Sequence, residues 1–388
     1  MAEFMFNICN GLDELRNRVY VIAPNSIGAG EFDKRQCFIT YRTKDLPKLC
    51  DCHKYDILRL IKCVILKIAY SIKIYSSMKQ IIQKREIKHI ICFHWNTFGI
   101  IALILSSKFG IPYYIVAHGL DIRRNKGSVN NRIKWLMQRV VFNNSKGIFV
   151  NSNYTKGIIL KYVNNYKNIC VTYCGVDYKK YIKLFPEPVT EKRDNRTVLL
   201  TVTRLVKRKG VDNAIRAFKI VEKSHNSMTY IIAGDGPDCQ RLKNLVYEMG
   251  LDGKVIFAGH VSENEKINYY NLANIFIMPS REEADGDAEG FGIVYLEANA
   301  CNLPVIAGDS GGVSDAVSDG YSGLLVDPND IEDIARKMDL LVSNSNYAAK
   351  LGDQGRKRVE EYFNWKEIAK RFDIVLRKCE SNMERDHV

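Results

Sequence analysis

The sequence predicts an α/β protein with two Rossmann-like domains, each a doubly wound parallel sheet, that face each other across a cleft. Short apolar runs rich in β-branched residues alternate with helical spacers through both halves of the chain. The 388 residues exceed what one small core needs and suit two domains of roughly 150 to 200 residues. A charged stretch without apolar periodicity interrupts the alternation near the middle.

Residues 1–177 form the predicted first domain. After a helical opening, its expected strands are 19–23, 37–41, 90–93, 113–117, 148–150 and 171–173. Residues 178–196, rich in Lys, Pro, Glu and Asp, form the predicted linker.

Residues 197–363 form the predicted second domain. Its expected strands are 198–202, 230–233, 255–257, 275–278, 304–307 and 324–326. We expect residues 364–388 to form a helix that packs back toward the first domain. Parallel sheets bind ligands beyond the carboxyl ends of their strands, so residues directly after strands are the functional candidates.

Positive charge is concentrated in the first half. Residues 1–190 carry 30 basic and 12 acidic side chains, whereas residues 191–388 carry 27 and 32, for a total of +13. Residues 55–88 interleave Lys and Arg with Ile, Leu, Val and Tyr. This pattern indicates either a helix lying on an anionic membrane surface or a helix packed on its own sheet with Lys outward. Nucleic acid is not expected, because no stacking aromatics or recognition motif accompany the charge.

The chain's start and its cysteines favour a cytoplasmic protein, peripheral on the inner face of the membrane if residues 55–88 bind it. The first residues lack the basic flank and apolar core of a signal peptide. The 11 cysteines are odd in number and scattered, which is typical of thiols in a reducing compartment. Cys50, Cys52 and His53 lack the paired spacing and fourth ligand of a zinc site. The uncharged stretch 89–107 contains polar residues at 94–97, which favours a strand, a turn and a helix over a membrane span.

A basic loop follows the first strand of the second domain. Arg204, Lys209 and Gly210 come after residues 198–202. Arg offers a fork of donors and Lys a point charge, so this loop suits a phosphate; a solvated basic loop is the alternative.

Two glutamates flank a glycine pair where a helix is expected to begin. Glu289 precedes Gly290, Phe291 and Gly292, and Glu297 lies eight residues beyond Glu289. Glycines let a ligand approach the backbone, and a helix start favours an anion. If the segment is helical throughout, the two carboxylates are about 12 Å apart along the axis. That separation can place them at opposite ends of a sugar diphosphate, where each accepts hydrogen bonds from a pair of hydroxyls.

This pair resembles the E-x7-E motif of retaining GT-B glycosyltransferases, especially glycosyltransferase family 4. The resemblance runs from about His118 to Trp365. Supporting motifs are Thr203-Arg204-Leu205, Ala233-Gly234-Asp235-Gly236-Pro237, Phe257-Ala258-Gly259-His260-Val261, Pro279-Ser280-Arg281, Ser310-Gly311-Gly312 and Gly323-Leu324-Leu325-Val326-Asp327-Pro328. The insertion 284–288 resembles bacterial phosphatidylinositol mannosyltransferases and related surface polysaccharide enzymes.

The resemblance implies a role for each matching residue. Arg204 and Lys209 would hold the donor diphosphate, Glu289 the sugar hydroxyls and Glu297 the ribose. The backbone of Gly290, Phe291 and Gly292 would line the sugar, and Gly259, His260 and Val261 would contact the base. These assignments make the first domain the acceptor domain and the second the nucleotide-sugar domain.

His118 follows the strand 113–117 of the first domain and is similar to the family's His at the cleft. A lone His after a strand is more often structural, whereas the family pattern favours a catalytic role.

The resemblance also implies retention of anomeric configuration, by attack on the face that the diphosphate leaves. Placed cations and a helix start can stabilise the departing diphosphate, so we expect no metal cofactor. Asp285 and Asp287 have Asp-x-Asp spacing, but they precede the sugar-binding Glu and are assigned no metal.

The first domain departs from the family at its start. Most members begin with a strand and a Gly-Gly loop that approaches the donor phosphates, and neither is found before the helical opening; Gly28 to Gly30 follow a later strand. We therefore expect the first strand to be missing, either because the start is an internal methionine of a longer protein or because the domain lacks it. The 388-residue form should turn over poorly compared with a form extended upstream.

The favoured function is a retaining transferase that moves a hexose, with mannose as the first choice, from a nucleotide diphosphate to a glycan or lipid-linked acceptor. A nucleotide-sugar epimerase or hydrolase on the same scaffold is one alternative, and a catalytically weak partner protein is another. A dehydrogenase is disfavoured, because no GxGxxG joins a first strand to its helix.

Overall fold

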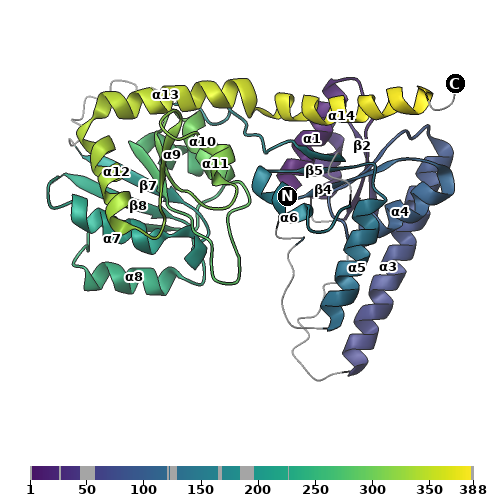
Figure 1. Cartoon of the computed structure of the whole chain (residues 1–388), viewed down its shortest axis with the longest axis horizontal. Coiled ribbons are helices and arrows are strands. Elements are labelled where there is room, and N and C mark those ends of the chain that lie inside the picture. The colour runs from purple at the N-terminus through teal and green to yellow at the C-terminus, as the bar shows by residue number, and fades with distance from the viewer. Residues whose placement is uncertain are drawn as a thin grey trace. The chain divides into compact units, whose positions relative to one another are not determined.

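A computed structural model describes residues 2–25, 28–43, 57–119, 122, 129–164, 168–183, 196–225 and 227–385 (Figure 1). The chain divides into two compact units. Unit 1 comprises Met1–Asn151, Thr155–Thr172 and Ala369–Val388, and unit 2 comprises Ser152–Tyr154 and Tyr173–Ile368. Most of the predicted linker, residues 184–195, lies outside the described residues, as do Cys50, Cys52 and His53.

Unit 2 contains one parallel sheet of six strands in the order β12-β11-β10-β7-β8-β9. The strands are β7 (Thr197–Val202), β8 (Met228–Ala233), β9 (Val255–Gly259), β10 (Ile275–Met278), β11 (Val305–Gly308) and β12 (Gly323–Val326). Strands β8, β10 and β11 are buried along their whole length, as expected for a sheet covered on both faces.

Helices and a 3-10 turn lie between these strands or follow the last of them. They are η2 (Lys207–Lys209), α7 (Val211–Val221), α8 (Cys239–Glu248), α9 (Lys266–Leu272), α10 (Ile293–Ala300), α11 (Val313–Ala316), α12 (Ile331–Ser343), α13 (Ser345–Tyr362) and the start of α14 (Trp365–Arg385). At the start of α12 the Asp330 side chain accepts hydrogen bonds from the backbone N–H groups of Glu332 and Asp333. One continuous apolar core, which includes Phe218, Tyr230 and Leu351, joins the sheet to α7, α8, α12 and α13.

Unit 1 contains two separate parallel sheets. The first pairs β1 (Tyr20–Pro24) with β2 (Ile39–Thr43). The second has the order β3-β4-β5-β6, formed by β3 (Ile90–Cys92), β4 (Tyr113–Ala117), β5 (Gly147–Val150) and β6 (Ile169–Val171). Among the described strands, β1 pairs only with β2, and β3 pairs only with β4.

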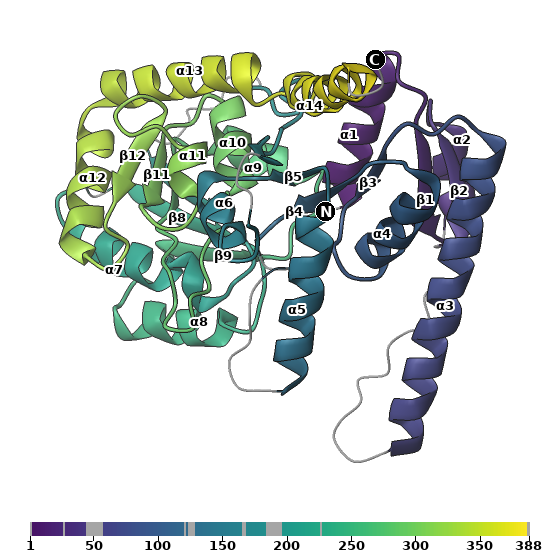
Figure 2. The same ribbon diagram turned by 45° about the vertical axis from the view of Figure 1, so that its right-hand side comes forward.

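The helices of unit 1 are α1 (Ala2–Glu14), α2 (Ala29–Lys34), α3 (Ile57–Lys84), α4 (Thr97–Phe109), α5 (Val129–Asn143) and α6 (Asn153–Ile159), joined by most of α14. Phe372 of α14 stacks on Phe149 of β5 with ring centroids 4.1 Å apart. The beginning of α3 projects beyond the rest of unit 1 (Figures 1 and 2).

The α/β prediction with parallel sheets is confirmed. Each strand expected from the sequence overlaps an observed strand, and no strand end differs by more than two residues. No helix in the described part of the chain combines the length and apolar content that crossing a bilayer requires.

Candidate functional site

The candidate site lies in unit 2, where the loops after β7, β10 and β11 meet. Two glycines bring these loops together. A Cβ on Gly210 would come 1.9 Å from the carbonyl oxygen of Pro279, and one on Gly312 would come 2.1 Å from that of Gly290. Because no side chain fits at these approaches, glycine is required for the three loops to share one edge of the sheet.

Glu289 is the centre of the site. Its side chain, 13% exposed, accepts a hydrogen bond from Arg208 Nη1 at 2.9 Å and is directly paired with Lys209 Nζ. Burial acts to raise the pKa of Glu289, but the charges and hydrogen bonds of Lys209 and Arg208 outweigh it and lower the pKa below its ordinary value. The carboxylate is therefore ionised near neutral pH and held in one orientation.

A second ion pair fixes the basic loop. Arg281 donates to Asp212 at 2.9 Å, and its backbone N–H donates to the Arg208 carbonyl at 2.8 Å. Burial acts to raise the pKa of Asp212, while Arg281 and Arg241 lower it to a net value below normal. Arg208 also lies 3.4 Å from Asp287. The loops after β7 and β10 are thus joined by contacts on either side of the pair formed by Arg208 and Glu289.

Glu297 lies inside α10 and is 7% exposed. The Tyr270 hydroxyl donates to it at 2.7 Å, and Lys266 Nζ lies 3.9 Å away. The helix begins at Ile293, after Gly292 at φ 90°, so the segment from Glu289 to Glu297 is not helical throughout. The separation of about 12 Å expected for a continuous helix therefore does not apply.

The remaining predicted donor residues fall at the same edge of the sheet. Arg204 follows β7 by two residues and is exposed. Gly259, His260 and Val261 end β9 or follow it, and the Gly259 carbonyl accepts a hydrogen bond from Gly234 N–H at 2.7 Å.

Gly290, Phe291 and Gly292 lie directly before α10. The Phe291 ring is 2% exposed and packs near Tyr173 and Phe363, so its side chain belongs to the core. Only the backbone of this segment is left to line a ligand.

His118 follows β4 in unit 1. Its ring meets Phe4 of α1 edge-on, with centroids 5.0 Å apart. Burial lowers the pKa of His118 to about 4, so the imidazole is neutral near pH 7.

Three contributors were missed at the sequence level. Arg208 lies in the predicted basic loop but carries no motif of its own, although it shares Glu289 with Lys209. Tyr270 and Lys266, which hold Glu297, lie on α9 and carried no motif. What the three residues share is that they follow a strand. Arg208 lies in the loop after β7, and Lys266 and Tyr270 lie on α9, which follows β9.

Two family descriptions match consecutive parts of the chain. Residues 1–180 match "Glycosyltransferase Family 4", and residues 186–358 match "Glycosyl transferases group 1". The chain is a member of glycosyltransferase family 4. Within the described residues no group of three or more His, Cys, Asp or Glu side chains is placed to hold a metal ion.

Curated relatives carry more specific names. A Mycolicibacterium smegmatis protein, "GDP-mannose-dependent alpha-(1-6)-phosphatidylinositol monomannoside mannosyltransferase", is 34% identical over 52% of this chain and 54% of its own length. The Staphylococcus aureus "Capsular polysaccharide biosynthesis glycosyltransferase CapM" is 30% identical over 53% of this chain and 54% of its own. The matches thus span about half the length of these relatives.

Solved structures share the GT-B fold of this family 4 chain. Sucrose-phosphate synthase from Thermosynechococcus elongatus aligns with a TM-score of 0.71 at 21% identity, covering 98% of this chain and 93% of that one. Anabaena Alr3699/HepE in complex with UDP aligns with a TM-score of 0.75 at 17% identity, covering 97% and 95%.

Proposed function

We propose that this family 4 protein is a retaining hexosyltransferase that transfers mannose from GDP-mannose to a glycan or lipid-linked acceptor. The observation that carries the proposal is Glu289, a buried carboxylate kept ionised by Arg208 and Lys209 beside a glycine-lined helix start. Relatives named as GDP-mannose-dependent mannosyltransferases support this choice of donor.

Each part of the donor has a partner in the proposed complex. Glu289 accepts hydrogen bonds from sugar hydroxyls, and the backbone of Gly290 to Gly292 lines the sugar. Arg204 and Lys209 bind the diphosphate, with Arg208 beside them. Glu297, oriented by Tyr270, binds the ribose hydroxyls, and Gly259, His260 and Val261 contact the base.

The proposed reaction proceeds on one face of the sugar. The acceptor hydroxyl oxygen bonds to the anomeric carbon as the bond from that carbon to the phosphate oxygen breaks. The electron pair stays on the diphosphate, which takes the hydroxyl proton. The cations and the first N–H groups of α10 stabilise the growing negative charge, so the proposed mechanism uses no metal ion. His118, neutral at pH 7, serves as a hydrogen-bonding group toward the sugar.

The acceptor is proposed to be presented at the cytoplasmic face of a membrane. On α3, Ile65, Ile68 and Ile72 are 59%, 55% and 62% exposed. Lys67 and Lys73 are exposed on the same segment. Apolar side chains on the outer surface of a basic helix favour insertion into an anionic bilayer over simple packing with Lys outward.

The transfer test uses purified protein, a panel of nucleotide sugars and membrane extract. We expect GDP-mannose to be consumed with mannose appearing in the lipid or glycan fraction, and only when extract is present. Sugar release or epimerisation with donor alone would instead indicate a hydrolase or epimerase. Unchanged glycan production in cells carrying Glu289→Gln would indicate a non-catalytic partner.

The membrane test is co-sedimentation with anionic vesicles. Changing Lys62, Lys67 and Lys73 to Glu should reduce binding about 100-fold, because about 1 kcal/mol per basic residue is lost near the surface. Changing Lys223, Lys350 and Lys357 in unit 2 to Glu is the control with the same change in net charge. Equal binding by the two triple variants would refute the assignment to α3.

A further inference from the structure

Asn151, the residue directly after β5 in unit 1, has a buried and unpaired side-chain atom. The residue is 8% exposed, and its Oδ1 atom has no hydrogen-bond partner among the described residues. Leaving a buried acceptor unsatisfied costs free energy, so folded proteins keep few such atoms. An oxygen of this kind is explained if a ligand donates a hydrogen bond to it.

The register of the sheet places Asn151 beside His118. The strands β4 and β5 are parallel, and Ala117 and Val150 are the last residues that pair. His118 and Asn151 are the next residue of each strand, so they lie on neighbouring strands about 4.8 Å apart. Ala117 and Val150 belong to the apolar core on one face of this sheet. Because side chains alternate along a strand, His118 and Asn151 point to the opposite face.

That opposite face is covered by aromatic rings. Phe149, two residues before Asn151, stacks on Phe372 of α14 with ring centroids 4.1 Å apart. The ring centroid of Phe4 in α1 lies 6.3 Å from that of Phe372 and 5.0 Å from that of His118. The two polar side chains therefore lie at the carboxyl edge of an apolar layer. A hydrogen bond formed there is strong, and an unpaired oxygen is costly, because little water competes.

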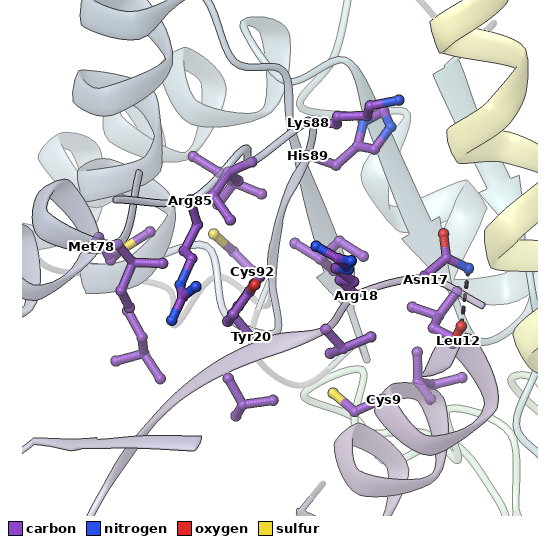
Figure 3. Close-up of a pocket in the computed structure, with 18 of the residues that line it drawn as sticks. Cys9, Leu12, Asn17, Arg18, Tyr20, Met78, Arg85, Lys88, His89 and Cys92 are labelled. Atoms are coloured by element: carbon purple, nitrogen blue, oxygen red, sulfur yellow. Dashed lines mark hydrogen bonds between the residues drawn. The ribbon is translucent and has the colours of Figure 1, made fainter. Parts of the chain in front are cut away.

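A cavity in unit 1 is a separate feature. It has a volume of about 1050 Å³ and is bordered by residues of α1, β1, α3, β3 and α14. Tyr20, Cys92 and Cys9 line it (Figure 3). Neither Asn151 nor His118 belongs to its lining, so filling this cavity would not satisfy the oxygen of Asn151.

The chemistry of Asn151 and His118 selects the class of ligand. An amide oxygen accepts hydrogen bonds, so the ligand must present an O–H or N–H group, which an ionised phosphate or carboxylate lacks. Burial lowers the pKa of His118 to about 4, so neither side chain carries a charge that would attract an anion near pH 7. A sugar hydroxyl meets both conditions, because it is neutral and donates a hydrogen bond.

We propose that Asn151 binds the acceptor, with its Oδ1 atom accepting a hydrogen bond from an acceptor hydroxyl group. The inference rests on the proposed transferase function, in which His118 contacts the transferred sugar. In that function Glu289 and the backbone of residues 290–292 in unit 2 already account for the hydroxyls of the donor sugar. A hydroxyl held by Asn151, one strand away from His118, therefore belongs to the molecule that receives the sugar.

The first test separates acceptor binding from donor binding. Asn151→Leu replaces the amide by an apolar side chain of similar volume, and transfer from GDP-mannose is measured over a dilution series of membrane extract. We expect half-maximal transfer to need about tenfold more extract, the size of one lost hydrogen bond in a dry site. The KM for GDP-mannose should stay unchanged. Asn144→Leu, the same change at an exposed position of unit 1, should behave as the wild type.

The outcomes of this test separate the inference from the proposed function. Absence of transfer by the wild-type chain would refute both. Wild-type transfer with the same half-maximal amount of extract for Asn151→Leu would overturn the inference alone. A raised KM for GDP-mannose would also overturn it, since Asn151 would then bind the donor, and so would a lower rate at saturating extract without a change in the half-maximal amount.

Unfolding distinguishes a ligand-binding residue from a structural one. Asn151→Leu removes an unpaired buried oxygen and leaves no cavity, so the denaturant midpoint should equal or exceed that of the wild type. Hydrogen exchange in β4 and β5 assigns the transition to unit 1. A midpoint well below that of the wild type would show that Asn151 stabilises the fold and would overturn the inference.

The position of Asn151 is tested by Asn151→Asp. A carboxylate beside His118 favours the charged imidazole, so the pKa of His118 should rise from about 4 toward its ordinary value of 6.5. The ring-proton signals of His118 in NMR spectra report the titration. Asn144→Asp is the control and should leave the pKa at about 4. An unchanged pKa of His118 in Asn151→Asp would show that the two side chains do not share a face of the sheet and would overturn the inference.

Discussion

The two units differ in how their parallel strands are joined into sheets. Unit 2 has a central strand, β7, paired on both sides, and one core that runs through the unit. Unit 1 has two sheets and two separate cores, and a cavity is bordered by residues of β1 and β3. The loop that follows β7 carries Arg208 and Lys209 to Glu289. The central strand of unit 2 therefore also positions the loop that places two basic side chains beside Glu289.

The largest effect we expect is from Glu289→Gln. If unit 2 carries the chemistry, loss of this carboxylate should lower kcat about 100-fold or more, the size seen for groups that stabilise a transition state electrostatically. Glu282→Gln, an exposed neighbour, should retain activity. Turnover measured with the preferred nucleotide sugar checks both. Equal rates for the two variants would mean that unit 2 does not hold the reacting sugar as described.

Lys209→Met should have the next largest effect, a loss of unfolding free energy. It leaves a buried carboxylate with Arg208 alone, and removing one member of a buried pair costs about 3 kcal/mol of unfolding free energy. Lys207→Met, at an exposed position of the same turn, is the control. Denaturant unfolding followed by hydrogen exchange in β10 locates the loss. Stability within error of Lys207→Met would show that the pair does not stabilise unit 2.

His118 gives unit 1 a pH dependence of its own. Its pKa is about 4 in the folded protein, against about 6.5 unfolded, so the unfolded chain binds the proton more tightly. Stability is full above pH 6.5 and falls as the pH drops toward 4, by about 2 kcal/mol at pH 5. His118→Asn should remove this decline in unit 1, whereas His260→Asn should not. The same slope in hydrogen exchange of β4 for both variants would contradict the burial of His118.

The smallest effect concerns Tyr270→Phe. This change removes the hydrogen bond to Glu297, and a bond to a charged group contributes about 1.5 kcal/mol, or roughly tenfold. We expect KM for the donor to rise with kcat nearly unchanged, because the ribose is remote from the reacting carbon. Tyr269→Phe is the control on the same helix. A fall in kcat without a change in KM would contradict the proposed ribose-binding role of Glu297 and would indicate a role in catalysis.

The strand alternation and the placement of Glu289 could be predicted from the sequence, because periodicity and glycine spacing are local properties. The partners of the two glutamates could not. Arg208 meets Glu289 across 81 residues and Tyr270 meets Glu297 across 27, so only tertiary packing brings them together. The exposure of Ile65 and Ile72 likewise depends on which other elements cover α3. The sequence of the helix alone does not contain that information.

The charge balance around Glu289 has a consequence for which anions the empty site attracts. Arg208 and Lys209 are matched there by Glu289 and Asp287, so this cluster of four is neutral before a donor arrives. Inorganic phosphate, abundant in any cell, meets little net attraction from the cluster and has no hydroxyls to offer Glu289. The proposed donor, a sugar nucleotide, would replace the internal counterions with contacts along its whole length. If the proposed donor binds here, the neutral cluster would disfavour small anions, and it would also lower the affinity for the diphosphate alone.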